Sequence, residues 1–144
     1  MKGLLSTLAL ALLFISQSVS AQKVNAEEKM QMTAEERQAA EEVFQKLIEP
    51  YKGKVIYVDF WGTWCPACLQ QMRASREIKG EMKGEDVVFM YIAFNSPEDK
   101  WKAEIEKSKM TGDNVVNYNP SNEDQILIVK LYNVVSFPRY MIID

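Results

Sequence analysis

The sequence predicts an α/β domain with a mainly parallel sheet, and three observations support this fold class. Two short, continuous apolar runs, Val55–Trp61 and 87–94, are rich in β-branched and aromatic residues, which is typical of strands buried on both faces. Stretches with helical spacing of apolar residues separate such runs, which is the pattern of βαβ units. The 144 residues are 47% apolar and 26% charged, enough for one domain with a core.

The remaining elements follow from capping residues and apolar spacing. Residues 33–36 (TAEE) form a capping-box pattern that opens the first helix, and Pro50 ends it. The second helix is expected to begin at Pro66 and to carry Leu69, Met72 and Ile78 on its apolar side. The expected helices cover about 33–48, 66–79, 97–109 and 122–132, and the further strands cover about 115–118 and 139–143.

The first 21 residues have the pattern of a signal peptide. Lys2 supplies a basic start, residues 4–15 form an apolar run, and residues 19–21 (VSA) offer a small-residue cleavage site. The run is shorter than the roughly 20 apolar residues that a membrane-spanning helix needs, although an uncleaved anchor remains the alternative. We therefore expect export to the periplasm or another extracytoplasmic place, without stable membrane insertion. A polar leader (22–32) and one domain (33–144) would follow.

Composition excludes several classes of function. The chain has 17 basic and 20 acidic residues, so it lacks the excess of positive charge that is typical of proteins that bind nucleic acid. It contains no histidine, so Ser-His-Asp or Cys-His catalysis and histidine-containing zinc sites are excluded. The two cysteines, Cys65 and Cys68, are therefore the main candidates for chemistry.

A C-x-x-C pair that follows a buried strand and opens a helix is typical of a redox-active dithiol. At a helix N-terminus, unpaired backbone N–H groups and the helix dipole stabilise a thiolate at Cys65, and Cys68 lies one turn further on. A disulfide with a purely structural role is the weaker alternative. Closing so short a loop lowers the entropy of the unfolded chain by an amount that stabilises the fold by only roughly 2 kcal/mol. A zinc site would need further ligands that this chain does not offer.

Asp59 is the one charged residue in the strand that leads to the cysteines. A buried carboxylate without a partner is costly, and a raised pKa usually relieves that cost. Asp59 is therefore a candidate to accept and donate the proton of Cys68. The alternative is a carboxylate near solvent at the end of the strand.

Residues 58–68 (VDFWGTWCPAC) resemble the active-site segment of thioredoxins. The FWGTWC stretch is especially similar to exported TlpA/ResA-like thiol-disulfide oxidoreductases, and 136–140 (SFPRY) is similar to their cis-proline loop. The resemblance covers about residues 54–144 and implies a thioredoxin-like fold. It implies an exposed nucleophile at Cys65, a resolving thiol at Cys68 and a cis peptide before Pro138. The expected substrate contacts are Trp64, Pro66, Phe137 and Pro138.

The sequence also departs from the family pattern. Arg73 stands where related proteins often carry a helix-kinking proline, and the dipeptide between the cysteines lacks the histidine of strong oxidants. In such oxidants this histidine helps to stabilise the thiolate, so its absence here favours a protein that reduces its substrates. The chain also stops before the last strand and helix that the resemblance implies, so we expect a C-terminally incomplete domain in which strand 139–143 has an unpaired edge.

By resemblance, the expected function is thiol-disulfide exchange with protein substrates outside the cytoplasm. Apocytochrome c is one possible substrate, and a membrane thiol-disulfide transporter is the implied electron donor. No metal or organic cofactor is implied. Two alternatives stay open: a disulfide oxidase or isomerase, and a noncatalytic binding module with the same fold.

Overall fold

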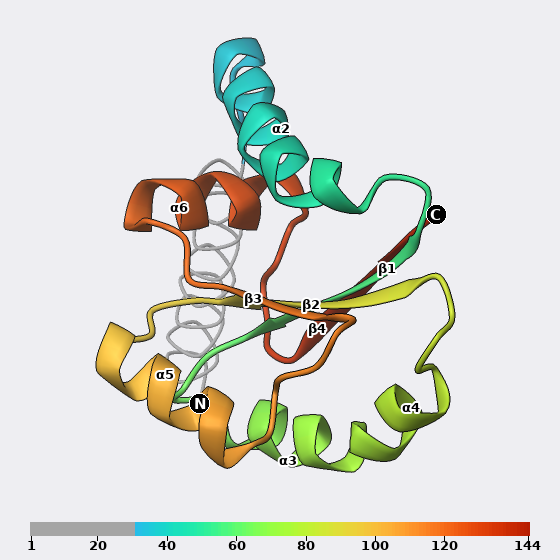
Figure 1. The fold of residues 1–144 in the computed structure, drawn as a ribbon. Helices are drawn as coiled ribbons and strands as arrows, with labels where there is room; N and C mark the ends of the chain where they lie inside the picture. The colour runs from blue at the N-terminus through green and yellow to red at the C-terminus, as the bar shows by residue number, and fades with distance from the viewer. Residues whose placement is uncertain (1–30) are drawn as a thin grey trace, which may run out of the picture. The chain divides into compact units, whose positions relative to one another are not determined.

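Four strands form one mixed sheet in the order β3-β2-β1-β4 (Figure 1). The strands β1 (Val55–Trp61), β2 (Val87–Ala93) and β3 (Val115–Tyr118) run parallel, and β4 (Arg139–Ile143) pairs antiparallel with β1. These bounds agree with the four apolar runs of the sequence to within one residue. The predicted α/β fold with a mainly parallel sheet is confirmed.

The computed structural model describes residues 31–144. The expected signal peptide and nearly all of the polar leader lie outside these described residues. Within them, no helix combines the length and the apolar character that crossing a membrane requires.

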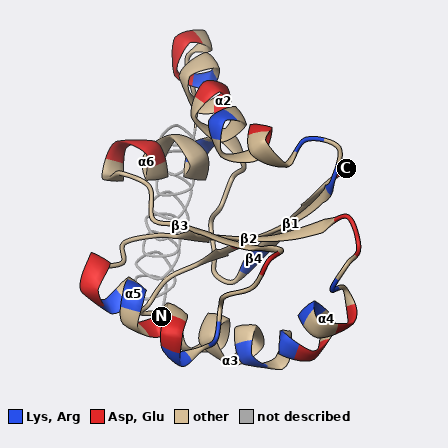
Figure 2. Cartoon of the chain, in the orientation of Figure 1, with Lys and Arg blue, Asp and Glu red and all other residues tan. Residues whose placement is uncertain are grey.

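Helices lie on both faces of the sheet (Figure 1). One face carries α2 (Ala34–Ile48) and α6 (Asn122–Leu131), which pack against each other, and a 3-10 turn, η1 (Glu49–Tyr51), follows α2. The other face carries α3 (Pro66–Ala74), α4 (Arg76–Glu81) and α5 (Glu98–Lys107). Charged residues are concentrated on these helices and the loops, while the strands carry few of them (Figure 2).

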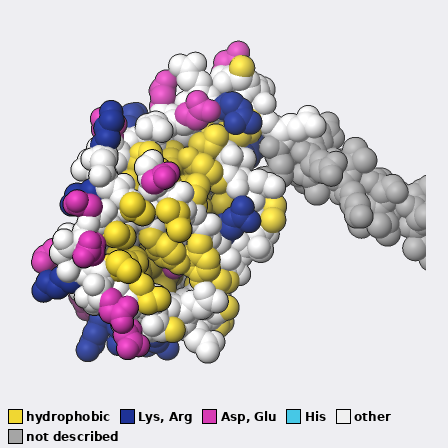
Figure 3. Space-filling model, turned by 90° about the vertical axis from the view of Figure 1, so that its right-hand side faces the viewer, with side chains coloured by type: hydrophobic (Ala, Val, Ile, Leu, Met, Phe, Trp, Pro, Cys, Tyr) yellow, Lys and Arg dark blue, Asp and Glu magenta, His cyan; other side chains and the backbone are white. Residues whose placement is uncertain are grey.

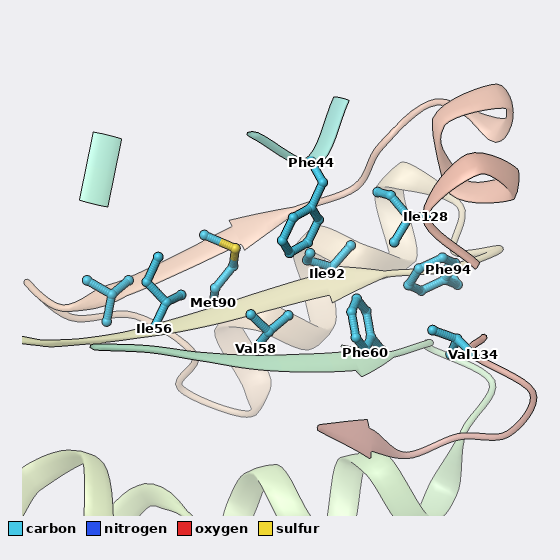
Figure 4. Close-up of a cluster of buried hydrophobic side chains, with 10 residues drawn as sticks. Phe44, Ile56, Val58, Phe60, Met90, Ile92, Phe94, Ile128 and Val134 are labelled. Atoms are coloured by element: carbon cyan, nitrogen blue, oxygen red, sulfur yellow. The ribbon is translucent and has the colours of Figure 1, made fainter. Parts of the chain in front are cut away.

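Side chains alternate across β1 and thereby divide the core into two clusters. Ile56, Val58 and Phe60 point toward α2 and α6, where they meet Phe44 and Ile128 (Figure 4). Tyr57, Asp59 and Trp61 therefore lie on the opposite face, which α3 covers. The second cluster contains Trp61 and both cysteines, so the dithiol is built into the core.

The predicted helix over 66–79 is wrong in one respect, because two helices replace it. Ser75 ends α3, and its Oγ donates to the Met72 carbonyl oxygen at 3.1 Å. Such a side-chain bond competes with the helical backbone pattern and favours a break. As a result Ile78, expected on the apolar side, is 52% exposed, while Lys79 is buried.

Two further isoleucines are exposed at the surface. In α6, Ile126 is exposed, whereas Ile128 lies in the core. Among the described residues β4 is an edge strand, and its Ile142 is 69% exposed. Apolar side chains gather on the side of the molecule where the chain ends (Figure 3).

Candidate active site

The two cysteines stand where β1 passes through a short loop into α3. Cys65 is the N-cap residue of α3, and Pro66 occupies the first turn, where a missing N–H leaves no hydrogen bond unmade. The backbone N–H of Cys68 donates to the Cys65 Sγ atom at 3.2 Å, and a disulfide joins the two sulfurs. When the disulfide is reduced, the same N–H group and the helix dipole stabilise a thiolate at Cys65.

Both cysteines are buried in this disulfide form. Cys65 is 5% exposed and Cys68 is 1% exposed, because they pack among Trp61, Met72 and other members of the second core cluster. The expectation of an exposed Cys65 is therefore wrong for this form. Cys65 is nevertheless the more accessible cysteine of the two.

An aromatic pair borders the disulfide. The Phe137–Pro138 peptide bond is cis, as the resemblance implied, and Phe137 packs against the cluster that holds the cysteines. The Phe137 ring centroid lies 5.3 Å from that of Trp64 and 5.4 Å from that of Phe94. Trp64 is half exposed and Pro66 is exposed, so apolar groups beside Cys65 face solvent.

Asp59 is buried in β1 on the face that α3 covers. It is only 3% exposed, so the alternative of a carboxylate near solvent is wrong. Burial raises the pKa of the Asp59 carboxyl from 3.8 to about 8, and the positive charge of Lys79 opposes part of that rise. No group within residues 31–144 hydrogen-bonds the Asp59 Oδ1 atom. Asp59 is therefore neutral at neutral pH and can exchange a proton in mildly alkaline solution.

A hollow of about 360 Å³ reaches Asp59 between β1, β4 and α3. Tyr57, Ser75 and Ile78 help to line it, and the hydroxyl of Tyr140 donates to Gln71 across it. This hollow gives Asp59 a path for proton exchange with solvent that avoids the disulfide.

Sequence reasoning missed Lys79, which the break at Ser75 turns inward. Lys79 is 7% exposed, and its Nζ atom lies 5.1 Å from the centroid of the Tyr91 ring. Burial and the nearby Arg76 lower the pKa of Lys79, whereas Asp59 raises it. A lysine in a charged helix normally indicates a solvated face, so nothing in the sequence would have singled it out.

Sequence reasoning also missed Ser96, at the loop that follows β2. Its Oγ accepts a hydrogen bond from the backbone N–H of Thr63, two residues before Cys65. These residues lie 33 positions apart, and no motif connects them.

Across residues 31–144, no three His, Cys, Asp or Glu side chains lie close enough together to hold a metal.

Comparisons with known proteins agree with this geometry. A family model described as thioredoxin-like matches residues 53–144. The thiol-disulfide oxidoreductase ResA of Geobacillus kaustophilus is 28% identical over 97 residues, which cover 67% of this chain and 52% of that protein. The chain spans about half or less of the curated relatives it matches.

Solved structures show the same fold at low sequence identity. The thioredoxin domain of a Bacteroides vulgatus thiol-disulfide oxidoreductase has a TM-score of 0.61 at 23% identity, with 67% of each chain covered. A secreted Mycobacterium tuberculosis disulfide oxidoreductase has a TM-score of 0.54 at 22% identity, with 65% of this chain and 64% of that chain covered. These likenesses confirm the predicted thioredoxin-like fold.

Proposed function

Because this chain belongs to the thioredoxin-like family, we propose that it is an oxidoreductase that exchanges the Cys65–Cys68 disulfide with disulfides of other proteins. The observation that carries this proposal is the disulfide at the first turn of α3. Phe137, whose peptide bond to Pro138 is cis, packs against the core cluster that contains both cysteines. The likeness to ResA supports the same activity.

The first step begins from the reduced dithiol. The Cys65 thiolate attacks one sulfur of a substrate disulfide, a new S–S bond forms, and the other substrate sulfur leaves as a thiolate that takes up a proton. The start of α3 supports the thiolate of Cys65 through its backbone N–H groups. The start of α3 therefore lowers the free energy needed to form the Cys65 thiolate, and no histidine is required.

The second step produces the disulfide that the structure contains. Because the pKa of Asp59 is about 8, a minor fraction of molecules carries an ionised Asp59 at neutral pH, and this fraction grows as the pH rises. In those molecules the Cys68 thiol loses its proton to the Asp59 carboxylate, and the Cys68 sulfur attacks Cys65 Sγ. The mixed disulfide breaks, and the second substrate sulfur leaves as a thiolate that takes up a proton to become a thiol. The substrate gains two electrons and the Cys65–Cys68 pair loses them. A carboxyl with a pKa of about 8 is suited to this role, because a free cysteine has a pKa of about 8.5.

Four residues around Cys65 are proposed to contact substrate. Trp64 and Phe137 supply an apolar surface, and Pro66 stands exposed beside it. The backbone of Phe137, fixed before Pro138, would pair with an extended substrate segment as an added strand does.

We propose that the protein acts as a reductant outside the cytoplasm. The dipeptide Pro66-Ala67 supplies no cation to stabilise an oxidant's thiolate, and the first 21 residues have the pattern of an export signal. An extracytoplasmic reductant needs electrons, so a membrane thiol-disulfide transporter is the proposed donor. Apocytochrome c is the specific substrate that the family resemblance suggests.

The reduction potential of the Cys65–Cys68 pair tests the direction. A value near about −270 mV would support a reductant, whereas a value near about −120 mV would indicate a disulfide oxidase. Equilibration with glutathione buffers, followed by thiol labelling of the full chain, measures it.

Turnover of a protein disulfide tests the activity itself. We expect the wild type to accelerate reduction of insulin by dithiothreitol, and Cys65→Ser to abolish the acceleration. Ser121→Ala, a change in the cap of α6 away from the site, is the matched control and should leave the rate unchanged. Equal rates for wild type and Cys65→Ser would refute the proposed function and leave a binding module.

A further inference from the structure

Three hydrogen bonds, two of which involve Ser96, hold the residues before Cys65 against the segment that follows β2. The backbone N–H of Thr63 donates to Ser96 Oγ at 3.0 Å. Ser96 Oγ donates in turn to the Phe94 carbonyl oxygen at 3.0 Å, and Trp64 Nε1 donates to the same oxygen at 2.9 Å. We call these four residues the Ser96 clamp. It fixes both the backbone and the indole of the residues that lead into Cys65.

Gly62 makes this close approach possible. A Cβ atom at position 62 would lie 2.5 Å from Trp64 Nε1 and 2.9 Å from the Phe94 carbonyl oxygen. Both distances are shorter than real Cβ contacts allow. The glycine and the serine thus support the same arrangement from two places in the sequence.

Ser96 is itself held firmly in place. Ser96 is buried, with only 8% of the residue exposed. Asn119 Nδ2 donates a hydrogen bond to the Ser96 carbonyl oxygen at 3.0 Å. The neighbouring Asn95 N–H donates to Gln125 Oε1 at 2.8 Å, which ties the loop to α6. The Ser96 hydroxyl is therefore held in a fixed position, and it positions residues 62–64, which lead from β1 to Cys65.

We propose that Ser96 is a positioning residue of the active site. Its hydroxyl holds Trp64 in the orientation in which Trp64 and Phe137 form the apolar surface that a protein disulfide meets beside Cys65. Ser96 acts through its hydrogen bonds with Thr63 and Phe94. The inference rests on the proposed function. It predicts that the clamp serves protein substrates and contributes little to a small disulfide, which offers no polypeptide to that surface.

The first measurement follows the indole of Trp64 and needs no activity. In a ¹⁵N–¹H spectrum the Trp64 indole signal is identified by its loss in Trp64→Phe. We expect Ser96→Ala to shift this signal and to speed its exchange with solvent. Ser108→Ala is the matched control, because Ser108 is fully buried and its Oγ donates to Glu104 Oε1 within the α5 region at 2.6 Å. The control should leave the Trp64 signal in place.

The second measurement compares insulin with glutathione disulfide as substrates. Ser96→Ala should lower kcat/KM for insulin about tenfold, which corresponds to about 1.4 kcal/mol, the size of one buried hydrogen bond. The value for glutathione disulfide should not change, and Ser96→Thr should restore the insulin value. A general loss of stability would lower kcat/KM for insulin and for glutathione disulfide together.

The outcomes separate this inference from the proposed function. An unmoved Trp64 signal, or an insulin-to-glutathione ratio equal to wild type, overturns the role of Ser96. If Ser96→Ala does not fold, Gly62→Ala displaces Trp64 with the serine intact, and an unchanged substrate ratio after that displacement overturns the proposal. If the wild type reduces neither substrate, the proposed function fails, and with it the role of Ser96; the Trp64 signal then reports only whether the clamp exists.

Discussion

Replacing Asp59 with asparagine should make the oxidised protein more stable, and the gain should grow with pH. In the unfolded chain this carboxyl loses its proton near its ordinary pKa of 3.8, but in the folded protein burial holds the proton until about pH 8. Between these two values the unfolded state has released a proton that the folded state retains. The stability of the wild type therefore falls as pH rises through this window. Asparagine has no such proton to lose.

The size of the effect follows from the same two pKa values. Each pH unit inside the window costs about 1.4 kcal/mol, so the wild type should lose about 2.5 kcal/mol relative to Asp59→Asn between pH 5 and pH 7. Lys79 and the tyrosines around Asp59 titrate in both proteins, so the comparison largely cancels their contributions.

Urea unfolding of the oxidised proteins at pH 5, 6 and 7 measures the difference. With a slope of about 1–3 kcal/mol per molar, the gap between the two midpoints should widen by roughly 1 M over this range. Asp113→Asn, at an exposed position before β3, is the control and should follow the wild type at every pH. Parallel curves for wild type and Asp59→Asn would show that Asp59 titrates normally, and the assignment of Asp59 as the proton acceptor would lose its basis.

Three further predictions follow from the packing and the chemistry of the site. Lys79→Met removes the positive charge that opposes the burial of Asp59, so the pKa of Asp59 should rise further; carboxyl ¹³C NMR would contradict this by showing no change or a fall. Cys68→Ser should trap a mixed disulfide between Cys65 and a protein substrate on a nonreducing gel, and an equal amount of adduct with Cys65→Ser would contradict the order of attack. Phe44→Ala should cost about 3–5 kcal/mol in urea unfolding, because the Phe44 ring is 1% exposed in the core between α2 and the sheet; a loss below about 1 kcal/mol would contradict that packing.

Local patterns were sufficient for the strands and for the dithiol. The apolar runs at Val55–Trp61 and Arg139–Ile143 carry their own strand signal, and the structure places strands at those residues. The pair Cys65 and Cys68, with Pro66 directly after the first cysteine, indicated a helix that begins at Pro66, and α3 begins there. Such signals lie within a few residues of each other, so they can be recognised without knowing what the segment packs against.

The break between α3 and α4 could not be predicted in this way. Helical spacing continues past Ser75, and only the bond from its side chain to the Met72 carbonyl shows where the helix ends. That break decides that Lys79 is buried and Ile78 is exposed, against the preference of both side chains.

The sequence by itself therefore determined the four strands and all of the helices except the split between α3 and α4, and it singled out the two sulfurs for which we propose thiol-disulfide chemistry. The tertiary structure alone decided the surroundings of those sulfurs. The burial of Asp59, the contact of Phe137 with Trp64 and the bond from Thr63 to Ser96 depend on segments that are far apart in the sequence. Local propensity contains no information about such contacts, because packing of the whole domain creates them.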